Sequence, residues 1–163
     1  MSRQLVEMES ILQRLIDEHR KLLSHVDAQQ SAMKAFDLKA MDAAVHLQEA
    51  ARLRIASLET QRRVAIRQIA RVLKFNGDLT IQKLAELVPP RGPTLLNLRD
   101  DLKSLVAQIM ARNHVAGKLA GAVLGHLNTV VRLLAGAVEQ AGIYTKHGVP
   151  QVATRIGVLE AVA

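Results

Sequence analysis

The amino-acid sequence predicts an all-α protein, an elongated antiparallel helical bundle or hairpin of three long helices plus one short helix. Three observations lead to this prediction. No glycine or proline, the two strongest helix breakers, occurs before Gly77. Apolar residues recur with the alternating spacing of three and four that marks one helix face. Only 2% of residues are aromatic although 49% are hydrophobic, so aliphatic side chains must fill the core, as is typical of helix bundles.

The first long helix is expected from about residue 3 to residue 35. Gln29 is a polar gap in its seam, and the pair Phe36-Asp37 breaks the register. The Asp37 carboxylate can cap the next helix by accepting the backbone N–H of Lys39 or Ala40. The apolar seam consists of Leu5, Met8, Leu12, Leu15, His19, Leu22, Val26 and Met33.

The second long helix and the short helix follow. Asn76-Gly77 is the expected end of the second helix, because both residues tolerate the left-handed conformation. The short amphipathic piece "TIQKLAELV" has Thr80 as its expected N-cap, and the breaker cluster "PPRGP" ends it. The seam of the second helix consists of Ala44, Leu47, Ala51, Ile55, Leu58, Ala65, Ile69 and Val72.

The third long helix is expected from Thr94 to Ala141, a segment without proline. At 1.5 Å per residue such a helix is roughly 70 Å long. It cannot be buried in a round domain, so we expect it to lie along the first two long helices. Its seam runs through Leu95, Leu98, Leu102, Leu105, Ile109, Asn113, Ala116, Ala120, Val123, Leu127, Val130, Leu134, Ala137 and Ala141.

Residues 1–148 are expected to form a single helical domain, and residues 149–163 a flexible or partner-ordered C-terminal tail. Gly142, Gly148 and Pro150 end the helical pattern. Val152, Ile156 and Leu159 then follow at i, i+4 and i+7, an apolar stripe on a short helix that would be marginal alone. The tail can fold back on the bundle or become ordered on another chain. Tyr144, one of only three aromatic residues, marks the joint between the two parts.

Two features of the third long helix have both a structural and a functional interpretation. Gly117, Gly121 and Gly125 form a smooth ridge. Close approach of another helix of this chain is the favoured explanation, a partner's helix is the functional one, and flexibility is a third. Asn113 lies in the seam, where a single asparagine either fixes helix register or contacts a partner.

The net charge of +7 is compatible with an acidic partner or a nucleic acid. Arg63, Arg67, Arg71 and Lys74 share one helix face, but a solvated face is favoured, since stacking on single strands needs aromatics. The stretch "LTIQKLAELVPPRGPTLLNLRDDL" superficially suggests a helix-turn-helix. Three prolines in its turn and Asp100 and Asp101 early in the second helix argue against that reading. Nucleic acid is therefore an unfavoured partner.

Catalytic and metal chemistry is also disfavoured. The chain has no cysteine, and its six histidines include no i,i+4 pair. No nucleophile motif or phosphate-cradling glycine loop is present, so we expect no enzyme and no cofactor. The N-terminus has no apolar stretch of secretory type. The most apolar window is interrupted by Lys118, His126, Asn128 and Arg132, so no membrane span is expected.

The order of several segments resembles the FlgN family of bacterial flagellar export chaperones. A heptad-like first helix precedes "FD", "ETQRRVAIRQIA", "LRDDLKSLVAQIMARN" and "YTKHG". The resemblance covers roughly residues 5–148, and its sharpest elements are Asn113 and the pair Tyr144 and Gly148. One departure is Ala116, where the family often has a second asparagine. The ridge of Gly117, Gly121 and Gly125 is also unusual.

The resemblance implies a cytoplasmic, non-enzymatic chaperone without a cofactor. Such a chaperone holds hook-associated (hook–filament junction) proteins, prevents their premature assembly and delivers them to the type III export apparatus, whose components are further partners. Family members contact clients through C-terminal regions, which correspond here to Tyr144, Gly148, Val152, Ile156 and Leu159. Apart from the resemblance, the functional interpretation of the third long helix makes Asn113, Gly117, Gly121 and Gly125 candidate secondary contact positions. The alternatives are a basic helical nucleic-acid-binding protein and a self-associating structural coiled coil.

Overall fold

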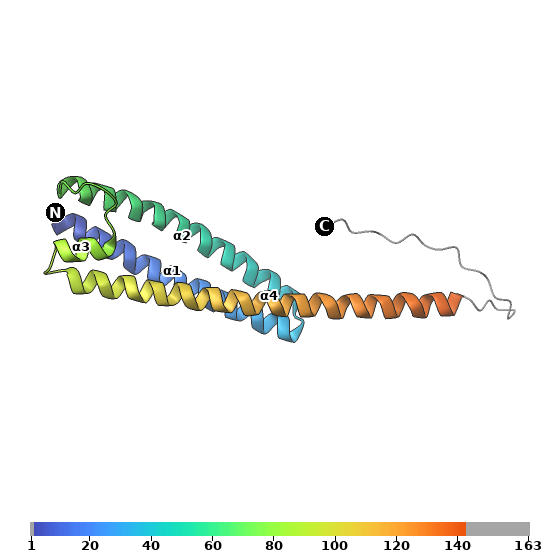
Figure 1. Cartoon of the computed structure of the whole chain (residues 1–163). Coiled ribbons are helices and arrows are strands. Elements are labelled where there is room, and N and C mark those ends of the chain that lie inside the picture. Colours follow the sequence, from blue (N-terminus) through green and yellow to red (C-terminus); the bar gives the residue numbers. More distant parts are fainter. Residues whose placement is uncertain (1, 143–163) are drawn as a thin grey trace. The chain divides into compact units, whose positions relative to one another are not determined.

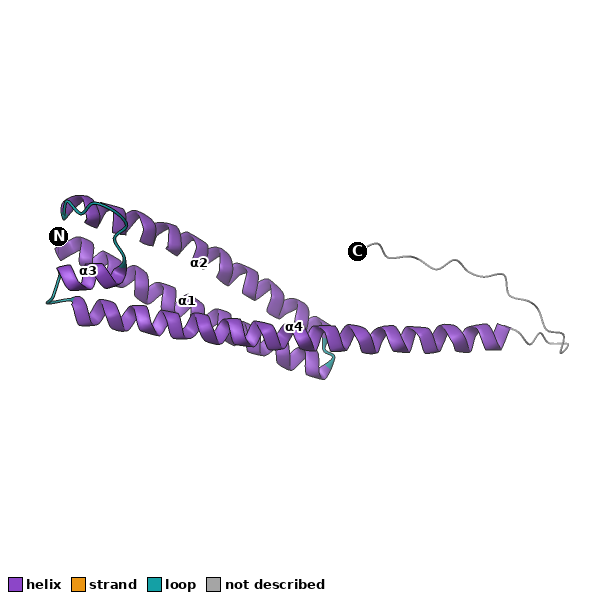
Figure 2. Ribbon diagram, viewed as in Figure 1, coloured by secondary structure: helices purple, strands orange, loops and turns teal. Residues whose placement is uncertain are grey.

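The computed structural model describes residues 2–142, with side-chain surroundings as far as residue 136 (Figure 1). This part contains four helices and no strand (Figure 2). The helices are α1 (Ser2–Ala35), α2 (Leu38–Val72), α3 (Ile81–Leu87) and α4 (Gly92–Gly142). The prediction of an all-α protein with three long helices and one short helix is confirmed.

The chain divides into two units at Ala120 and Gly121. The first unit contains α1, α2, α3 and the part of α4 up to Ala120. The described part of the second unit is the section of α4 from Gly121 to Gly142.

Polar contacts give the helix directions in the first unit. Glu18 contacts Arg54 and Gln29 contacts Gln48, so later positions in α1 face earlier positions in α2. These two helices form an antiparallel hairpin. Asp27 in α1 contacts Arg112, well inside α4. Near the start of α1, Glu9 contacts Arg91, which directly precedes α4. The first section of α4 therefore runs parallel to α1.

The core of the first unit consists of aliphatic side chains from all four helices. Met8 and Leu15 of α1 and Leu84 of α3 are fully buried. Burial of each such side chain contributes about 2 kcal/mol, so this cluster holds α3 onto the hairpin. A smaller cluster nearer the loop between α1 and α2 consists of Leu22, Val26, Ala51 and Ile109.

Both predicted N-caps are confirmed. The Asp37 carboxylate accepts the backbone N–H of Ala40 at 2.9 Å, and the Thr80 hydroxyl accepts that of Lys83 at 3.1 Å. Each bond satisfies an amide hydrogen that has no partner within its own helix.

The predicted end of α2 at Asn76-Gly77 is wrong. The helix ends at Val72, and Lys74 takes the left-handed conformation, with φ of 52°. The Phe75 N–H bonds back to the Ala70 carbonyl at 2.9 Å, which closes the end as in a Schellman motif. The ring of Phe75 packs against the core. That contact favours the earlier stop, and Gly77 belongs to the loop that follows.

The first residue of α4 is Gly92, two positions before the expected Thr94. A Cβ atom at Gly92 would lie 2.7 Å from the carbonyl oxygen of Ala85, so only glycine fits this contact with α3. Pro93 follows in the first turn, where its missing N–H costs nothing.

Candidate functional site

The apolar seam predicted for α4 is correct only for its first section. Leu95, Ile109 and Ala116 are buried in the first unit. No residue after Ala116 is buried among those whose surroundings the structure describes. The expectation that this helix packs along the first two long helices therefore holds only for its first section among the described residues. A helix of 51 residues exceeds α1, with 34 residues, and α2, with 35.

The second unit has an exposed apolar face, which we call the α4 arc. Its five members are large apolar residues between Leu124 and Leu134. At 100° per residue they lie within about 120° of the helix circumference. Leu124 is 66% exposed, Leu127 44% and Leu134 62%. Large contiguous apolar surfaces of this kind mark interaction sites. The α4 arc consists of Leu124, Leu127, Val130, Val131 and Leu134.

The glycine ridge has no neighbour in the described residues. Cβ atoms added at Gly117, Gly121 and Gly125 would meet nothing within 4 Å. The favoured explanation, close approach of another helix of this chain, is therefore not met by any helix among the described residues. On a helical projection, Gly121 and Gly125 lie on the side away from the α4 arc. Each glycine lowers helix stability by about 1 kcal/mol relative to alanine, so this section is an intrinsically weak helix.

Asn113 is exposed and therefore fixes no buried register. Two glutamines that the sequence reasoning missed have that role. Gln30 is buried and donates to the Arg112 carbonyl of α4 at 2.7 Å. Gln48 is buried and donates to the Oε1 atom of Gln29 at 2.8 Å. These bonds fix the relative positions of three helices.

The seam predicted for α2 needs two corrections. Leu47 and Val72 are each 50% exposed, whereas Gln48 takes the inward position between Ala44 and Ala51. The spacing from Ala44 to Ala51 admits either residue at the inward position. The hydrogen bond between Gln48 and Gln29 of α1 favours the glutamine.

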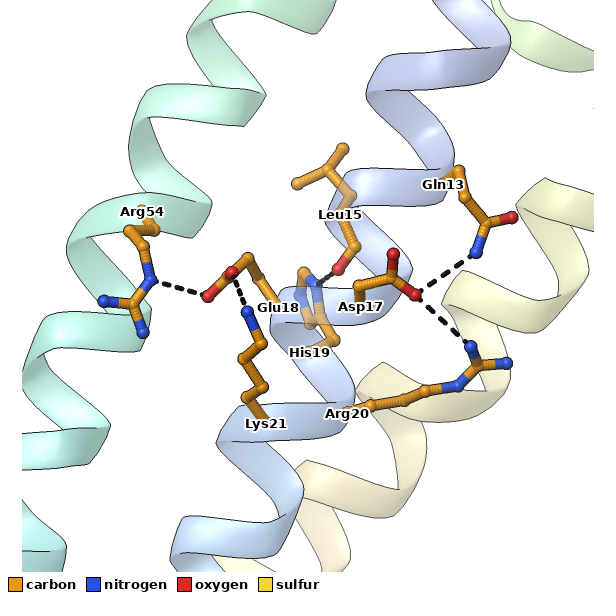
Figure 3. Close-up of polar contacts among 8 residues, drawn as sticks. All are labelled: Gln13, Leu15, Asp17, Glu18, His19, Arg20, Lys21 and Arg54. Atoms are coloured by element: carbon orange, nitrogen blue, oxygen red, sulfur yellow. Dashed lines mark hydrogen bonds and ion pairs between the residues drawn. The ribbon is translucent and has the colours of Figure 1, made fainter.

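A polar cluster crosses from α1 to α2 (Figure 3). The carboxylate of Glu18 accepts from Lys21 and from Arg54, each at 2.7 Å. The hydrogen bond from Lys21, and next that from Arg54, lower the pKa of Glu18 from its ordinary value. His19, expected at the core or rim, is half-buried, and its Nδ1 lies 2.7 Å from the Leu15 carbonyl. The polar cluster therefore has a structural role, because the contact between Glu18 and Arg54 joins α1 to α2.

Side chains on the basic face of α2 are held along their own helix. The guanidinium of Arg63 donates to the Glu59 carbonyl at 3.4 Å, and that of Arg67 to the Arg63 carbonyl at 3.1 Å. Both side chains are exposed. Within residues 2–142 no cluster of three or more histidine or carboxylate side chains could hold a metal ion.

The mean hydropathy of α4 also reflects its apolar residues. By length and composition, the section Gly92–Gly136 is one helix that could cross a membrane, with a mean hydropathy of 1.3 in its most apolar window. Only 6% of that window is buried. An exposed protein-binding face gives the same signature, so this observation alone does not define the partner.

The C-terminal part of the predicted site lies outside the described residues. This part consists of Tyr144, Gly148, Val152, Ile156 and Leu159. The secondary positions Asn113, Gly117, Gly121 and Gly125 are all exposed. The α4 arc was not predicted as a site, although Leu127, Val130 and Leu134 belong to the predicted seam. The length of the seam in the sequence indicates this exposed face, because the seam of α4 is longer than α1 or α2, the helices that could cover it.

An all-α chain whose described residues leave an apolar helix face exposed is typical of the class of helical partner-binding proteins. The model of the FlgN family, described as FlgN protein, matches residues 1–151. The chain therefore belongs to the FlgN family, and the resemblance found in its sequence is confirmed. Comparisons with curated proteins and with solved structures gave no match.

Family membership supplies the general role. FlgN proteins are flagellar export chaperones, a family of binding proteins and not of enzymes. They are in general soluble and cytoplasmic.

Proposed function

We propose that this protein is a cytoplasmic export chaperone for hook-associated (hook–filament junction) flagellar proteins. It prevents their premature assembly and aids their delivery to the type III export apparatus. The observation that carries the proposal is the α4 arc, a row of five large apolar side chains that are exposed in the described structure. Membership of the FlgN family supports the chaperone role.

The α4 arc suits an amphipathic client helix. Members of the arc recur along the helix with a spacing of three or four, so a second helix can pack against them side by side. Covering the arc removes apolar surface from water on both chains, which is the main source of affinity. It also keeps the client's own apolar stripe from self-assembly.

The weak helix propensity of this section suits reversible binding. Gly121 and Gly125 make the helix costly to maintain, so part of the binding free energy is spent on ordering it. Coupled ordering lowers the net affinity of a chaperone that must release its client at the export apparatus.

The C-terminal positions extend the proposed contact. In this proposal Tyr144 and Gly148 form the joint between the domain of residues 1–148 and the tail of residues 149–163. Val152, Ile156 and Leu159 would supply further apolar anchors for the client. Asn113, Gly117, Gly121 and Gly125 remain secondary contact positions, supported by their exposure.

A charge placed in the α4 arc tests the proposal. We expect Leu127→Glu combined with Leu134→Glu to abolish co-purification of a hook-associated subunit, because binding would bury two carboxylates. The matched control is Thr129→Glu, which adds a carboxylate at an exposed position on the opposite side of the same helix and should retain the subunit. Equal retention of the subunit by all three proteins would refute the site.

Two further measurements separate the alternatives. A salt titration with duplex DNA should give weak binding, whereas tight binding with a steep salt slope would favour a nucleic-acid-binding protein.

Light scattering should detect a complex with the subunit. Self-association without such a complex would favour a structural coiled coil.

A further inference from the structure

A second apolar surface that the described residues leave exposed lies in the first unit, between α2 and α4 beside α3. It is a groove with a volume of ≈ 420 Å³. Its lining residues on α4 are spaced by three and one in alternation, so they form one continuous stripe. The stripe spans about 16 Å, the length of three helical turns. These residues are Arg99, Leu102, Lys103, Val106, Ala107 and Met110.

The groove has an apolar floor and a charged rim. Leu12 of α1, Ile81 of α3 and Leu102 of α4 contribute to the floor. Met110 is 68% exposed and Val106 38% exposed, although both are apolar. Exposed methionine side chains adapt their shape to a partner surface, which is common at binding grooves.

The charges at the rim are mainly positive. Arg62 is held by Glu59, with 2.8 Å between Nη2 and Oε2. Arg99 is held by Asp100 at 2.8 Å and by the Gln82 side chain at 3.1 Å. Lys103 makes no ion pair within the described residues. The groove therefore offers fixed arginines and a lysine beside an apolar floor.

We infer that this groove docks an amphipathic helix of a partner protein, with apolar residues at i, i+3 or i+4, and i+7, and with carboxylates on its flanks. The length of the stripe matches three turns of helix, and the rim charges match Asp and Glu. The site is distinct from the α4 arc and does not depend on the proposed client site.

Other occupants fit the groove less well. A second copy of this chain has a net charge of +7 and the same cationic rim, so charge repulsion opposes it. Small-molecule sites use a few polar groups placed inside the pocket to orient the ligand. Here the charged side chains stand at the rim, each about one-third exposed or more.

A synthetic peptide tests the inference directly. The probe is a fluorescein-labelled helical peptide with leucine at i, i+3, i+7 and i+10 and glutamate on both flanks, titrated against the full chain. The control peptide has lysine in place of every glutamate. We expect the acidic peptide to bind at least about tenfold more tightly, because only its charges complement the rim.

Variants of the chain locate the binding site. Met110→Glu should weaken binding of the acidic peptide about tenfold, because the new carboxylate meets apolar side chains and like charge. Gln108→Glu, on the opposite side of α4, should change it less than about twofold. Circular dichroism should show both variants folded, since both residues are exposed. The Leu127→Glu, Leu134→Glu variant should bind the acidic peptide as the unmodified chain does.

Three results would overturn the inference. The first is equal binding of the acidic and lysine peptides, or binding that Met110→Glu leaves unchanged. The second is self-association of the chain that Met110→Glu abolishes, which would make a second copy the occupant. The third is loss of peptide binding in the Leu127→Glu, Leu134→Glu variant, which would merge the groove with the client site.

Discussion

At the scale of single residues, Gly92 and Gly117 occupy α4 for different reasons. A Cβ at Gly92 would meet the backbone of Ala85, whereas one at Gly117 would meet nothing within 4 Å. We expect Gly92→Ala to lower the free energy of unfolding by about 1–3 kcal/mol, because backbone must move. Gly117→Ala should raise it by up to about 1 kcal/mol. Urea denaturation of both variants checks these signs, and equal effects would contradict the close contact with α3.

The ion pairs of Glu18 stabilise the hairpin of α1 and α2 in a pH-dependent way. Its pKa is lowered in the folded state by Lys21 and Arg54. Its stabilisation is therefore present above the unfolded pKa and is lost as pH falls through the folded pKa. We expect Glu18→Gln to lower the free energy of unfolding by about 1 kcal/mol at pH 7. The difference should shrink toward zero in acid. Urea denaturation at pH 7 and in acid measures the free energy of unfolding of both proteins. An equal difference between them under the two conditions would contradict a role for the ion pairs.

The roles of some residues could be predicted from their sequence neighbours, whereas the roles of others depend on contacts with distant residues. Asp37 and Thr80 were assigned correctly, because a cap depends on residues three positions away. Gln48 was missed, because its inward position depends on Gln29 of another helix. The end of α2 was misplaced for the same reason, since the packing of Phe75 against the core decides it.

At the scale of elements, α4 shows what periodicity establishes. The seam predicted the helical state of α4 correctly, and it predicted the inward face correctly as far as Ala116 except at the exposed Asn113. Periodicity cannot give the length of the helices that cover it, so the exposed α4 arc was assigned to an interior. The groove between α2 and α4 was not predicted, because Val106 and Met110 lie off the seam.

The glycines of the second unit give a prediction for this element. We expect Gly121→Ala with Gly125→Ala to increase helicity in circular dichroism, since each substitution favours helix by about 1 kcal/mol. Client affinity, measured by calorimetry, should rise by up to about thirtyfold, because up to about 2 kcal/mol less of the binding free energy goes into ordering the helix. Unchanged helicity would show that another contact already holds this section. Lower affinity would show that the added methyl groups obstruct the secondary contact at these glycines, and that this loss outweighs the gain in helix order.

At the scale of the whole molecule, we expect stability and client binding to be separable. Truncation after Gly148 should leave the melting temperature nearly unchanged, because the buried residues of the described structure all precede Gly121. The same truncation should weaken client binding by removing the apolar anchors of the tail. Loss of cooperative unfolding on truncation would make the tail structural and refute its proposed role.

Hydrogen–deuterium exchange of the full chain, alone and with a hook-associated subunit, measures whether the client covers the α4 arc. We predict rapid exchange across residues 121–136 in the free chain, because the helix there has no buried side chain. Addition of the subunit should slow exchange in this section markedly. A stable complex that leaves exchange in residues 121–136 unchanged would contradict the assignment of the α4 arc as the client site.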